Sequence, residues 1–378
     1  MSAEPPFVPE TSVLAVASHV VSGNVGNKIA VFALQSMGCD VSAINTVQFM
    51  SYGLSIICSN ASVKRKGNHT GYKQWKGTRV SAQEITDLWE GLKQSYLDDF
   101  DMMLSGYVPG AAAVEAVGNI GKELKHKSKD QKPGSFFWVL DPVMGDNGRL
   151  YVAEDVVPAY KNLIQYADLI LPNQFEAELL SGVKITDFAS LENAVRVLHR
   201  DFGVPHIVIT SVSLPTLGSS PSPQTTRTMS VVGSTMTSDR HPRLFKITFP
   251  VFECYFSGTG DMFAALMVAR MREAVTNYDK HSNGNGSLVG KLSWLSPDDV
   301  DALDLPLTRA AEKVLASMHE VLDRTCASLT AEMAEKQKDK DLDEKTLHLL
   351  KSRASELKLA RNLGSLRNPK VEYRAEKM

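Results

Sequence analysis

Phe256-Ser257-Gly258-Thr259-Gly260-Asp261-Met262-Phe263-Ala264-Ala265 reads as a glycine-rich turn that runs directly into an apolar helix. Gly258 and Gly260 permit backbone conformations with positive φ, so that successive N–H groups can converge on one point. The positive end of the following helix faces the same point, and such a place binds an anion, typically a phosphate. Asp261 is a carboxylate in this position, which makes chemical sense if it takes a proton from a hydroxyl group that attacks the phosphate. The alternative is that Asp261 is only the N-cap of its helix, a position that Asp favours.

The rest of the chain alternates short apolar runs with amphipathic segments. The apolar runs are typical of strands buried on both faces of a sheet, and we expect such strands over residues 13–17, 41–47, 101–105, 136–140, 168–171 and 206–211. The amphipathic segments predict helices over residues 29–37, 81–97, 111–125, 191–202 and 308–329, with a charged loop over 125–134 and edge strands over 229–232 and 243–248. This alternation predicts an α/β fold in which a central, mostly parallel sheet carries helices on both faces.

Polar residues follow three of the expected strands. In parallel sheets, ligands bind beyond the carboxyl ends of the strands. Ser18 follows the first strand, and the Asp141 and Asp146 carboxylates follow the fourth, where they are well placed to meet a metal or a phosphate. Asn173 and Glu176 follow the next strand and, being three residues apart, face one side of a first helical turn. The structural alternatives are a helix-start hydroxyl at Ser18 and a simple Asp-Pro turn at Asp141.

The composition of the chain is that of an ordinary globular protein. Its 378 residues carry a net charge of −2, which does not indicate nucleic acid or an anionic membrane as a partner. No apolar run approaches the ~20 residues of a membrane span, and the first residues hold no secretory signal. The four cysteines, Cys39, Cys58, Cys254 and Cys326, show no paired spacing, so we expect free thiols in a reducing compartment, the cytoplasm with the nucleus as a second location.

Four stretches stand outside one domain that we expect over residues 12–329. Residues 1–11 predict a flexible N-terminus. Residues 50–67 are first apolar and then basic and fit neither neighbour, and residues 273–305 begin as an Asn-, Gly- and Ser-rich surface segment; we interpret both as insertions. In residues 330–378 acidic and basic side chains alternate with few apolar ones, which predicts a solvated, partly helical extension.

The candidate residues belong to longer motifs whose order along the chain is informative. These motifs are Ser18-His19-Val20, Val47-Gln48-Phe49, Asn68-His69-Thr70-Gly71-Tyr72, Asp141-Pro142-Val143-Met144-Gly145-Asp146, Pro172-Asn173-Gln174-Phe175-Glu176, Ile209-Thr210-Ser211 and Gly258-Thr259-Gly260-Asp261. In these motifs and in their order the chain resembles the eukaryotic pyridoxal kinases, a branch of the ribokinase-like superfamily. The last motif marks only the superfamily, whereas the first and third point to the pyridoxal branch.

This resemblance implies a ribokinase-like three-layer sandwich and a phosphotransferase. The expected reaction is ATP-dependent phosphorylation of the 5′-hydroxymethyl group of pyridoxal, pyridoxine or pyridoxamine, which yields pyridoxal 5′-phosphate in vitamin B6 salvage. Asp261 would be the base, and Gly258, Thr259 and Gly260 would bind the charge that develops on the γ-phosphoryl group. Mg²⁺ or another divalent cation, a monovalent cation such as K⁺, and a homodimer are further expectations from the family.

The resemblance also assigns the binding residues. Ser18 would contact the pyridine nitrogen, and the contacts around the ring would come from Val47, Phe49, Thr70 and Tyr107. The residues near ATP would be Asp141, Asp146, Asn173, Glu176, Thr210, Ser211, Phe256 and Ser257. The metal would be held by Asp141 and Glu176, largely through water.

Three departures from the family pattern bear on function. Asn24 stands where an aromatic residue is usual, and Leu171 where Thr is common. Residues 50–67 replace a single Ser between Phe49 and Asn68, and we hypothesise that they are translated intron or a gene-model error. Two alternative functions remain: a related kinase that acts on hydroxymethylpyrimidine, and a vitamer- or nucleotide-binding relic that the insertion has inactivated.

Overall fold

The computed structural model describes residues 8–51, 76–214, 227–252, 254, 256–281, 287–336 and 343–378. Thr70, Cys58 and all of the 50–67 segment beyond Ser51 lie outside these ranges, so the predictions made for them are not tested. Val8 and Thr11 are fully buried. The last part of the expected flexible N-terminus therefore packs on the core.

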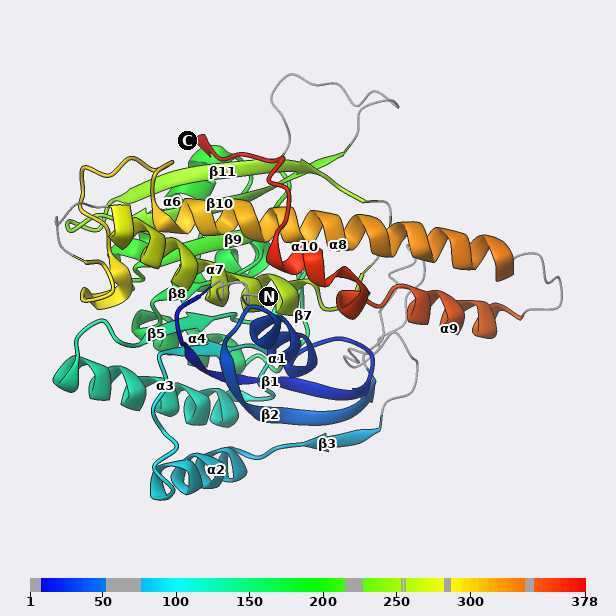
Figure 1. Cartoon of the computed structure of the whole chain (residues 1–378), viewed down its shortest axis with the longest axis horizontal. Helices are drawn as coiled ribbons and strands as arrows, with labels where there is room; N and C mark the ends of the chain where they lie inside the picture. The colour runs from blue at the N-terminus through cyan, green and yellow to red at the C-terminus, as the bar shows by residue number, and fades with distance from the viewer. Residues whose placement is uncertain are drawn as a thin grey trace, which may run out of the picture.

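A single large sheet organises the chain (Figure 1), in the order β12-β11-β10-β9-β8-β5-β4-β1-β2-β3. Its strands are β1 (Ser12–Ser22), β2 (Asp40–Ser51), β3 (Gly77–Arg79), β4 (Met102–Ser105), β5 (Phe137–Leu140), β8 (Leu169–Ile170), β9 (His206–Val212), β10 (Thr228–Met236), β11 (Pro242–Pro250) and β12 (Glu376–Lys377). The strands from β2 to β9 pair in parallel, and antiparallel partners extend the sheet at both ends. The expected mostly parallel sheet is confirmed.

Helices cover both faces of this sheet. They are α1 (Asn27–Ser36), α2 (Ala82–Gln94), α3 (Ala111–Gln131), α4 (Val156–Leu163), α5 (Gln174–Ser181), α6 (Phe188–Arg200), α7 (Thr259–His281), α8 (Pro306–Lys336), α9 (Glu344–Ala354) and α10 (Leu363–Arg367), with 3₁₀ turns η1 (Ile164–Tyr166), η2 (Leu292–Trp294) and η3 (Leu359–Asn362). A small hairpin of β6 (Gly145–Asp146) and β7 (Arg149–Leu150) stands apart from the sheet.

Strand β1 shows why three layers form. Its side chains alternate between the two faces of the sheet, as strand geometry requires. Val13 and Ala15 join the apolar cluster under α1, α7 and α8, whereas Leu14 and Val16 join the cluster under α2 to α6. All four are fully buried. The apolar run 13–17 is therefore a strand with a core on each face, as predicted.

Several predicted boundaries and strand positions were wrong. Helix α3 continues to Gln131, through the residues expected as a charged loop, because its buried face persists while the other face carries the charges. Strands β10 and β11, both expected as edge strands, are internal in the described sheet, although β11 is covered only by the two-residue β12. Helix α7 continues past Arg272 to His281, and Trp294, within the expected 273–305 insertion, is fully buried and stacks on Phe137 with 4.2 Å between ring centroids. The start of that segment is thus part of the domain and not a surface addition.

The C-terminal extension is partly helical, as predicted, but the prediction that it is solvated was wrong. The segment after α8 returns along that helix (orange to red in Figure 1) and ends as β12, which pairs with β11. Its few apolar side chains are placed where they can be buried: Leu357, Leu359 and Leu366 are at most 3% exposed. A low fraction of apolar residues did not reveal this, because burial depends on their positions rather than on their number.

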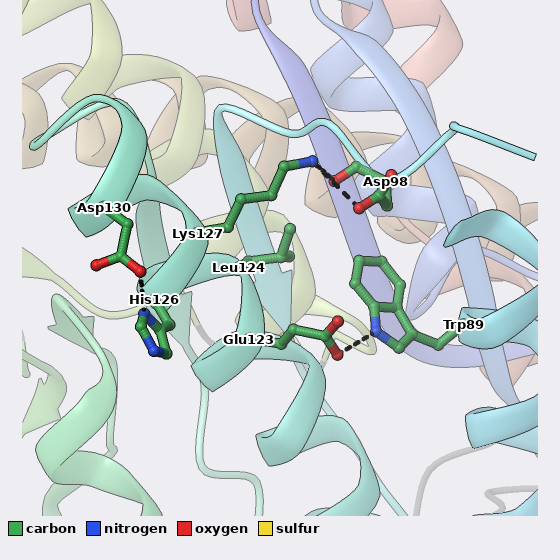
Figure 2. A pocket seen from close by; sticks show the side chains of 7 residues that line it. All are labelled: Trp89, Asp98, Glu123, Leu124, His126, Lys127 and Asp130. Atoms are coloured by element: carbon green, nitrogen blue, oxygen red, sulfur yellow. Dashed lines mark hydrogen bonds and ion pairs between the residues drawn. The ribbon is translucent and has the colours of Figure 1, made fainter. Parts of the chain in front are cut away.

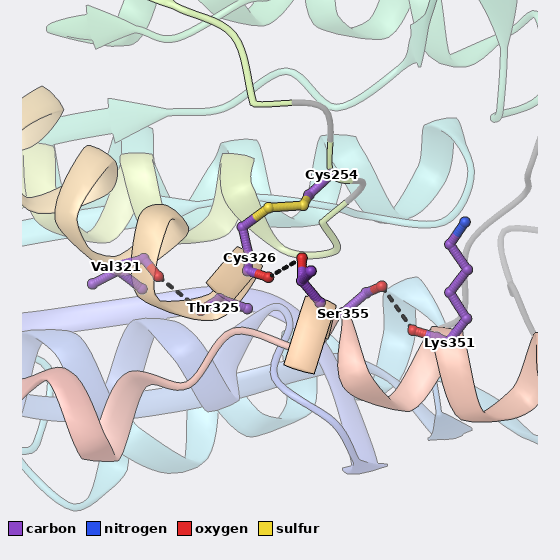
Figure 3. Close-up of a disulfide and its surroundings, with 7 residues drawn as sticks. Cys254, Val321, Thr325, Cys326, Lys351 and Ser355 are labelled. Carbon is purple, nitrogen blue, oxygen red and sulfur yellow. Dashed lines mark hydrogen bonds between the residues drawn. A yellow bond between two sulfur atoms is a disulfide. The ribbon is translucent and has the colours of Figure 1, made fainter. Parts of the chain in front are cut away.

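The expectation of four free thiols fails for two of them. Cys254 and Cys326 form a disulfide, with 6.0 Å between their Cα atoms, that links the segment before the glycine-rich turn to α8 (Figure 3). Cys39 is free and buried. The two bonded positions are 72 residues apart, so local spacing could not indicate the pairing. Among the described residues, none of the helices is long and apolar enough to cross a membrane.

Candidate active site

The glycine-rich turn has a positive φ at Gly258, as expected, and continues directly as regular helix. Gly258 has φ 80°, and a Cβ there would lie 2.6 Å from the backbone oxygen of Asn24, so only glycine fits. Gly260, expected to share a positive φ, instead lies in the first turn of α7. It is solvent-exposed, and the nearest atom to a Cβ placed on it would be Oδ2 of Asp141, at 3.8 Å. The turn therefore opens toward the end of β5.

Asp261 lies inside the first turn of α7 rather than at its cap, because the helix begins two residues earlier, at Thr259. Its partly buried carboxylate accepts a hydrogen bond from the Gly26 N–H, in the loop between β1 and α1. Burial raises the pKa of Asp261 to about 6, although the Gly26 hydrogen bond opposes the rise. A carboxylate with this pKa is mostly ionised at neutral pH and still a useful base.

Asp141, at the end of β5, is the centre of a group of three carboxylates. Its side chain is 8% exposed, and the described part of the chain offers it no hydrogen-bond donor. Burial, together with the nearby carboxylates of Glu176 and Asp261, raises the pKa of Asp141 far above its usual range. The negative charge of these two neighbours opposes ionisation of Asp141, and a nearby cation would relieve it.

Asn173 and Glu176 form a capping box at the start of α5. The Asn173 Oδ1 accepts the Glu176 N–H at 2.9 Å, and the Glu176 Oε2 accepts the Asn173 N–H at 2.9 Å. The Glu176 Oε1 also accepts the N–H groups of Met144 and Gly145, at 2.8 and 3.2 Å. Burial raises the pKa of Glu176 to about 7 against these hydrogen bonds. The pair thus holds the loop after β5 in place, which explains why both residue types are needed at this spacing.

Asp146 does not join the three carboxylates. It is exposed, in the β6–β7 hairpin, and its two oxygens accept hydrogen bonds from the backbone and side-chain nitrogens of Asn147, at 2.7 and 2.9 Å. Asn147 and Gly148 have φ values of 50° and 75°, as a two-residue hairpin turn requires. Asp146 also contributes to the raised pKa of Glu176, so it lies at the rim of the same site.

A separate apolar wall faces the glycine-rich turn from β1 and β2. Val47 and Phe49, at most 6% exposed, pack with Tyr107 in a small cluster of their own. Ser18 is buried at a register shift between Ala17 and His19, an irregularity of the kind that re-aims a side chain. The structure brings Val47, Phe49 and Tyr107 together, and it places Ser18 within β1 rather than after the strand, where the sequence had predicted it.

Sequence comparison identifies the family. The sequence model for phosphomethylpyrimidine kinase matches residues 112–279. The pyridoxal kinase of Homo sapiens is 34% identical over 339 residues, which cover 86% of this chain and 89% of that protein. The chain belongs to the pyridoxal kinase family. The Arabidopsis thaliana pyridoxal kinase is 31% identical over 369 residues, 97% of this chain and 94% of that protein. The structure of Leishmania donovani pyridoxal kinase in complex with ADP and pyridoxamine matches with a TM-score of 0.70 and 27% identity, over 98% of this chain and 100% of that one.

Two of the residues that the sequence predicted near ATP, Thr210 and Ser211, lie in β9, beside the chain that follows β8. Thr210 is near the end of β9, and its N–H donates to the Pro172 oxygen at 3.0 Å, which ties it to the strand end before Asn173. Ser211 follows it and is partly buried. Phe256 packs edge-on against Phe252, with 6.2 Å between centroids.

Sequence reasoning missed the two other apolar members of the wall and one backbone donor. Val20 and Val25 complete the cluster around Phe49. Gly26 has φ 54°, and a Cβ there would lie 2.4 Å from the Ser18 Oγ. The sequence signal for Gly26 was a glycine between an expected strand and an expected helix, a place where a backbone N–H can point at a ligand or a carboxylate.

A cavity of about 310 Å³ lies away from this site, between α2 and α3 (Figure 2). The Trp89 Nε1 donates to Glu123 at 2.8 Å, and Lys127 pairs with Asp98 at 3.1 Å. Its polar groups thus bond to one another, and none of its lining residues belongs to the candidate site.

Proposed function

We propose that this member of the pyridoxal kinase family transfers the γ-phosphoryl group of ATP to the 5′-hydroxymethyl group of pyridoxal, and of pyridoxine and pyridoxamine, in vitamin B6 salvage. One observation carries the proposal: the carboxylate of Asp261, in the glycine-rich turn, lies near that of Asp141 and beside the loop between β1 and α1. Solved relatives from Leishmania donovani hold ADP together with pyridoxamine or pyridoxine.

The proposed reaction uses two sets of groups in the glycine-rich turn. Asp261, with a pKa of about 6, accepts the proton of the substrate hydroxyl as that oxygen attacks the γ-phosphorus. The N–H groups of Gly258, Thr259 and Gly260 stabilise the charge that develops on the transferred phosphoryl oxygens. Both roles are positioning and electrostatics, so no covalent enzyme intermediate is involved.

The acidic residues fit a phosphate-bound divalent cation such as Mg²⁺. Among the described residues no cluster of three ligands could hold a metal alone, as is usual where a metal comes with substrate phosphates. The Asp141 carboxylate lacks a described donor and is available as a ligand, whereas the Glu176 oxygens already accept three N–H groups and would act through water. When bound, the cation neutralises charge on the phosphates.

We assign the B6 vitamer to the apolar wall. Ser18 would meet the pyridine nitrogen, with Val47, Phe49 and Tyr107 around the ring, and Thr70 remains a candidate outside the described residues. The nucleotide would extend past Asp146, Thr210, Ser211, Phe256 and Ser257.

An Asp261→Asn variant tests the proposal. Production of pyridoxal 5′-phosphate should fall by two to four orders of magnitude, as general-base loss does, while ATP binding measured by calorimetry stays within a few-fold. Turnover that survives in this variant would refute the role of Asp261 as the base.

A second candidate function is phosphorylation of hydroxymethylpyrimidine, because the matching family model describes that chemistry. Curated pyridoxal kinases cover far more of the chain. Competition between the two substrates at equal concentration separates the candidates, and preference for the pyrimidine would reject our first choice. The same assay with and without residues 50–67 tests whether the insertion inactivates the enzyme.

Three accompanying features are also proposals: a homodimer, a monovalent cation such as K⁺, and a cytoplasmic location, with the nucleus as a second one. Light scattering tests the first, and replacement of K⁺ by a bulky cation during turnover tests the second. For the third, cell fractionation is informative because the Cys254–Cys326 disulfide is of a kind that is rare in reducing compartments.

A further inference from the structure

The segment Ser355–Lys358 lies between the first loop and the catalytic turn, although it is about 100 residues distant from the turn in sequence. Glu356 forms an isolated parallel bridge with Ser257, directly before Gly258. On the other side, the Asn24 Nδ2 donates to the Leu357 oxygen at 2.9 Å. The Glu356 carboxylate also faces Gly23, since a Cβ placed there would lie 3.2 Å from its Oε1. One short segment thus contacts both halves of the candidate active site.

This segment has its own firm anchors. Leu357 is fully buried in the core. The Lys358 N–H donates to the Thr325 Oγ1 of α8 at 3.3 Å, and the Asn362 Nδ2 donates to the Lys358 oxygen at 2.8 Å. Because these contacts are made with the core and with the segment itself, they fix the segment independently of the loop that it touches.

The contacts of Asn24 lead directly to the catalytic base. The backbone oxygen of Asn24 packs against Gly258, so closely that a Cβ there would lie at 2.6 Å. Two residues later, the Gly26 N–H donates to Asp261. The path from the C-terminal segment to the base is therefore Leu357, Asn24, Gly26, Asp261.

We propose that Ser355–Lys358 is a positioning strap, and that Asn24 is the positioning residue through which it holds the first loop against the catalytic turn. This inference rests on the proposed role of Asp261 as the base. Asn24 is also where this chain departs from the aromatic residue usual in the family. In this chain the residue at that position is an amide whose Nδ2 bonds to the strap.

The strap predicts a specific kinetic signature. Without the Asn24 hydrogen bond the loop is less constrained, the Gly26 N–H is less well placed, and the geometry of proton removal deteriorates. The turnover number should fall about 10-fold, because a misplacement of ~1 Å can cost ~100-fold in rate and the loop is only loosened. The KM for ATP should change little, because the substitution does not touch the residues proposed to bind ATP. The acid limb of the pH profile should also move to higher pH, since the Gly26 hydrogen bond favours the ionised form of Asp261, while Asp141, the other charged group facing it, is unchanged.

The test compares two near-isosteric, uncharged substitutions in the full-length protein. Asn24→Leu removes the hydrogen bond from loop to strap, and Asn362→Leu removes one that anchors the strap without touching the loop. Thermal unfolding reports whether each variant is folded, and kcat, KM for ATP and the pH profile are then measured with pyridoxal.

We expect the lowered kcat and the shifted acid limb in Asn24→Leu alone. In Asn362→Leu the buried Leu357 side chain and the bond from Lys358 to Thr325 still hold the strap, so kcat should stay within about twofold of wild type. A normal kcat and pH profile in folded Asn24→Leu would overturn the inference, as would an equal loss in both variants, which would indicate general packing. Failure of the proposed function is distinguishable, because the wild-type protein would then not phosphorylate pyridoxal at all.

Discussion

Gly260→Ala separates the folding role of the glycine-rich turn from its chemical role. Gly260 is in the first turn of α7, and a Cβ there would meet only Oδ2 of Asp141, at an ordinary contact distance of 3.8 Å. Alanine is favoured over glycine in a helix by up to ~1 kcal/mol, so the free energy of unfolding should not fall and could rise by that amount. The corresponding increase in Tm is about 1–2 °C for a chain of this size.

The added methyl group nevertheless projects into the space between the turn and Asp141, where the transferred phosphoryl group would lie. A displacement of ~1 Å costs ~100-fold, so kcat/KM for pyridoxal should fall by about that factor while Tm is kept. Gly364→Ala is the matched control, because a Cβ on that glycine meets nothing within 4 Å and α10 contains none of the candidate site residues. It should leave activity unchanged. Wild-type kcat/KM in Gly260→Ala would refute the placement of the phosphate.

Three further predictions follow from the charges and the disulfide. Since burial raises the pKa of Asp261 to about 6, kcat/KM should rise with pH through a midpoint near 6, and at pH 5 should be about a tenth of its plateau; a midpoint near 4 would contradict this environment. Asp141→Asn should raise Tm at pH 8 while removing activity, because the raised pKa means that the charged form opposes folding. This gain in Tm should vanish as the pH falls toward the usual pKa of a carboxyl group, where Asp141 is protonated in both the folded and the unfolded state. A lower Tm of the variant at pH 8 would contradict the prediction, because it would show that the ionised Asp141 stabilises the fold. Cys326→Ser should lower the free energy of unfolding by up to ~4 kcal/mol, as expected for a closed loop of this length, and a reductant should produce the same loss in the wild type but no further loss in the variant.

The central part of the fold and the acidic site could be predicted because both follow local rules. Apolar runs such as 13–17 could only be strands with a core on each face, and the ends of parallel strands meet at one edge of a sheet. Asp141 and Glu176 follow the neighbouring strands β5 and β8, so the sequence could predict that they lie close together. Asp146 shows the limit of this rule: a two-residue hairpin turns it to the surface five residues after Asp141.

What could not be predicted depends on contacts between distant parts of the chain. The Asn24 side chain and the Leu357 oxygen are separated by 333 positions, and no local pattern indicates that they bond. The disulfide is a second case. The charged C-terminal segment also misled the prediction, because a segment packed on a finished core needs few apolar side chains, provided that they are well placed.

The insertion at residues 50–67 enters the structure at a place that limits its effect on the site. Strand β3 is at one edge of the sheet, paired antiparallel with β2. The Met50 N–H donates to the Lys76 oxygen at 2.8 Å, so the two ends of the connection that holds the insertion are bonded to each other. Phe49 keeps its register with Gly77 and with Val20 of β1. Lengthening such a closed connection costs only ~0.6 kcal/mol for each doubling. We therefore expect the sheet, rather than the connection, to hold the apolar wall, and Phe49 to keep its position with or without residues 50–67.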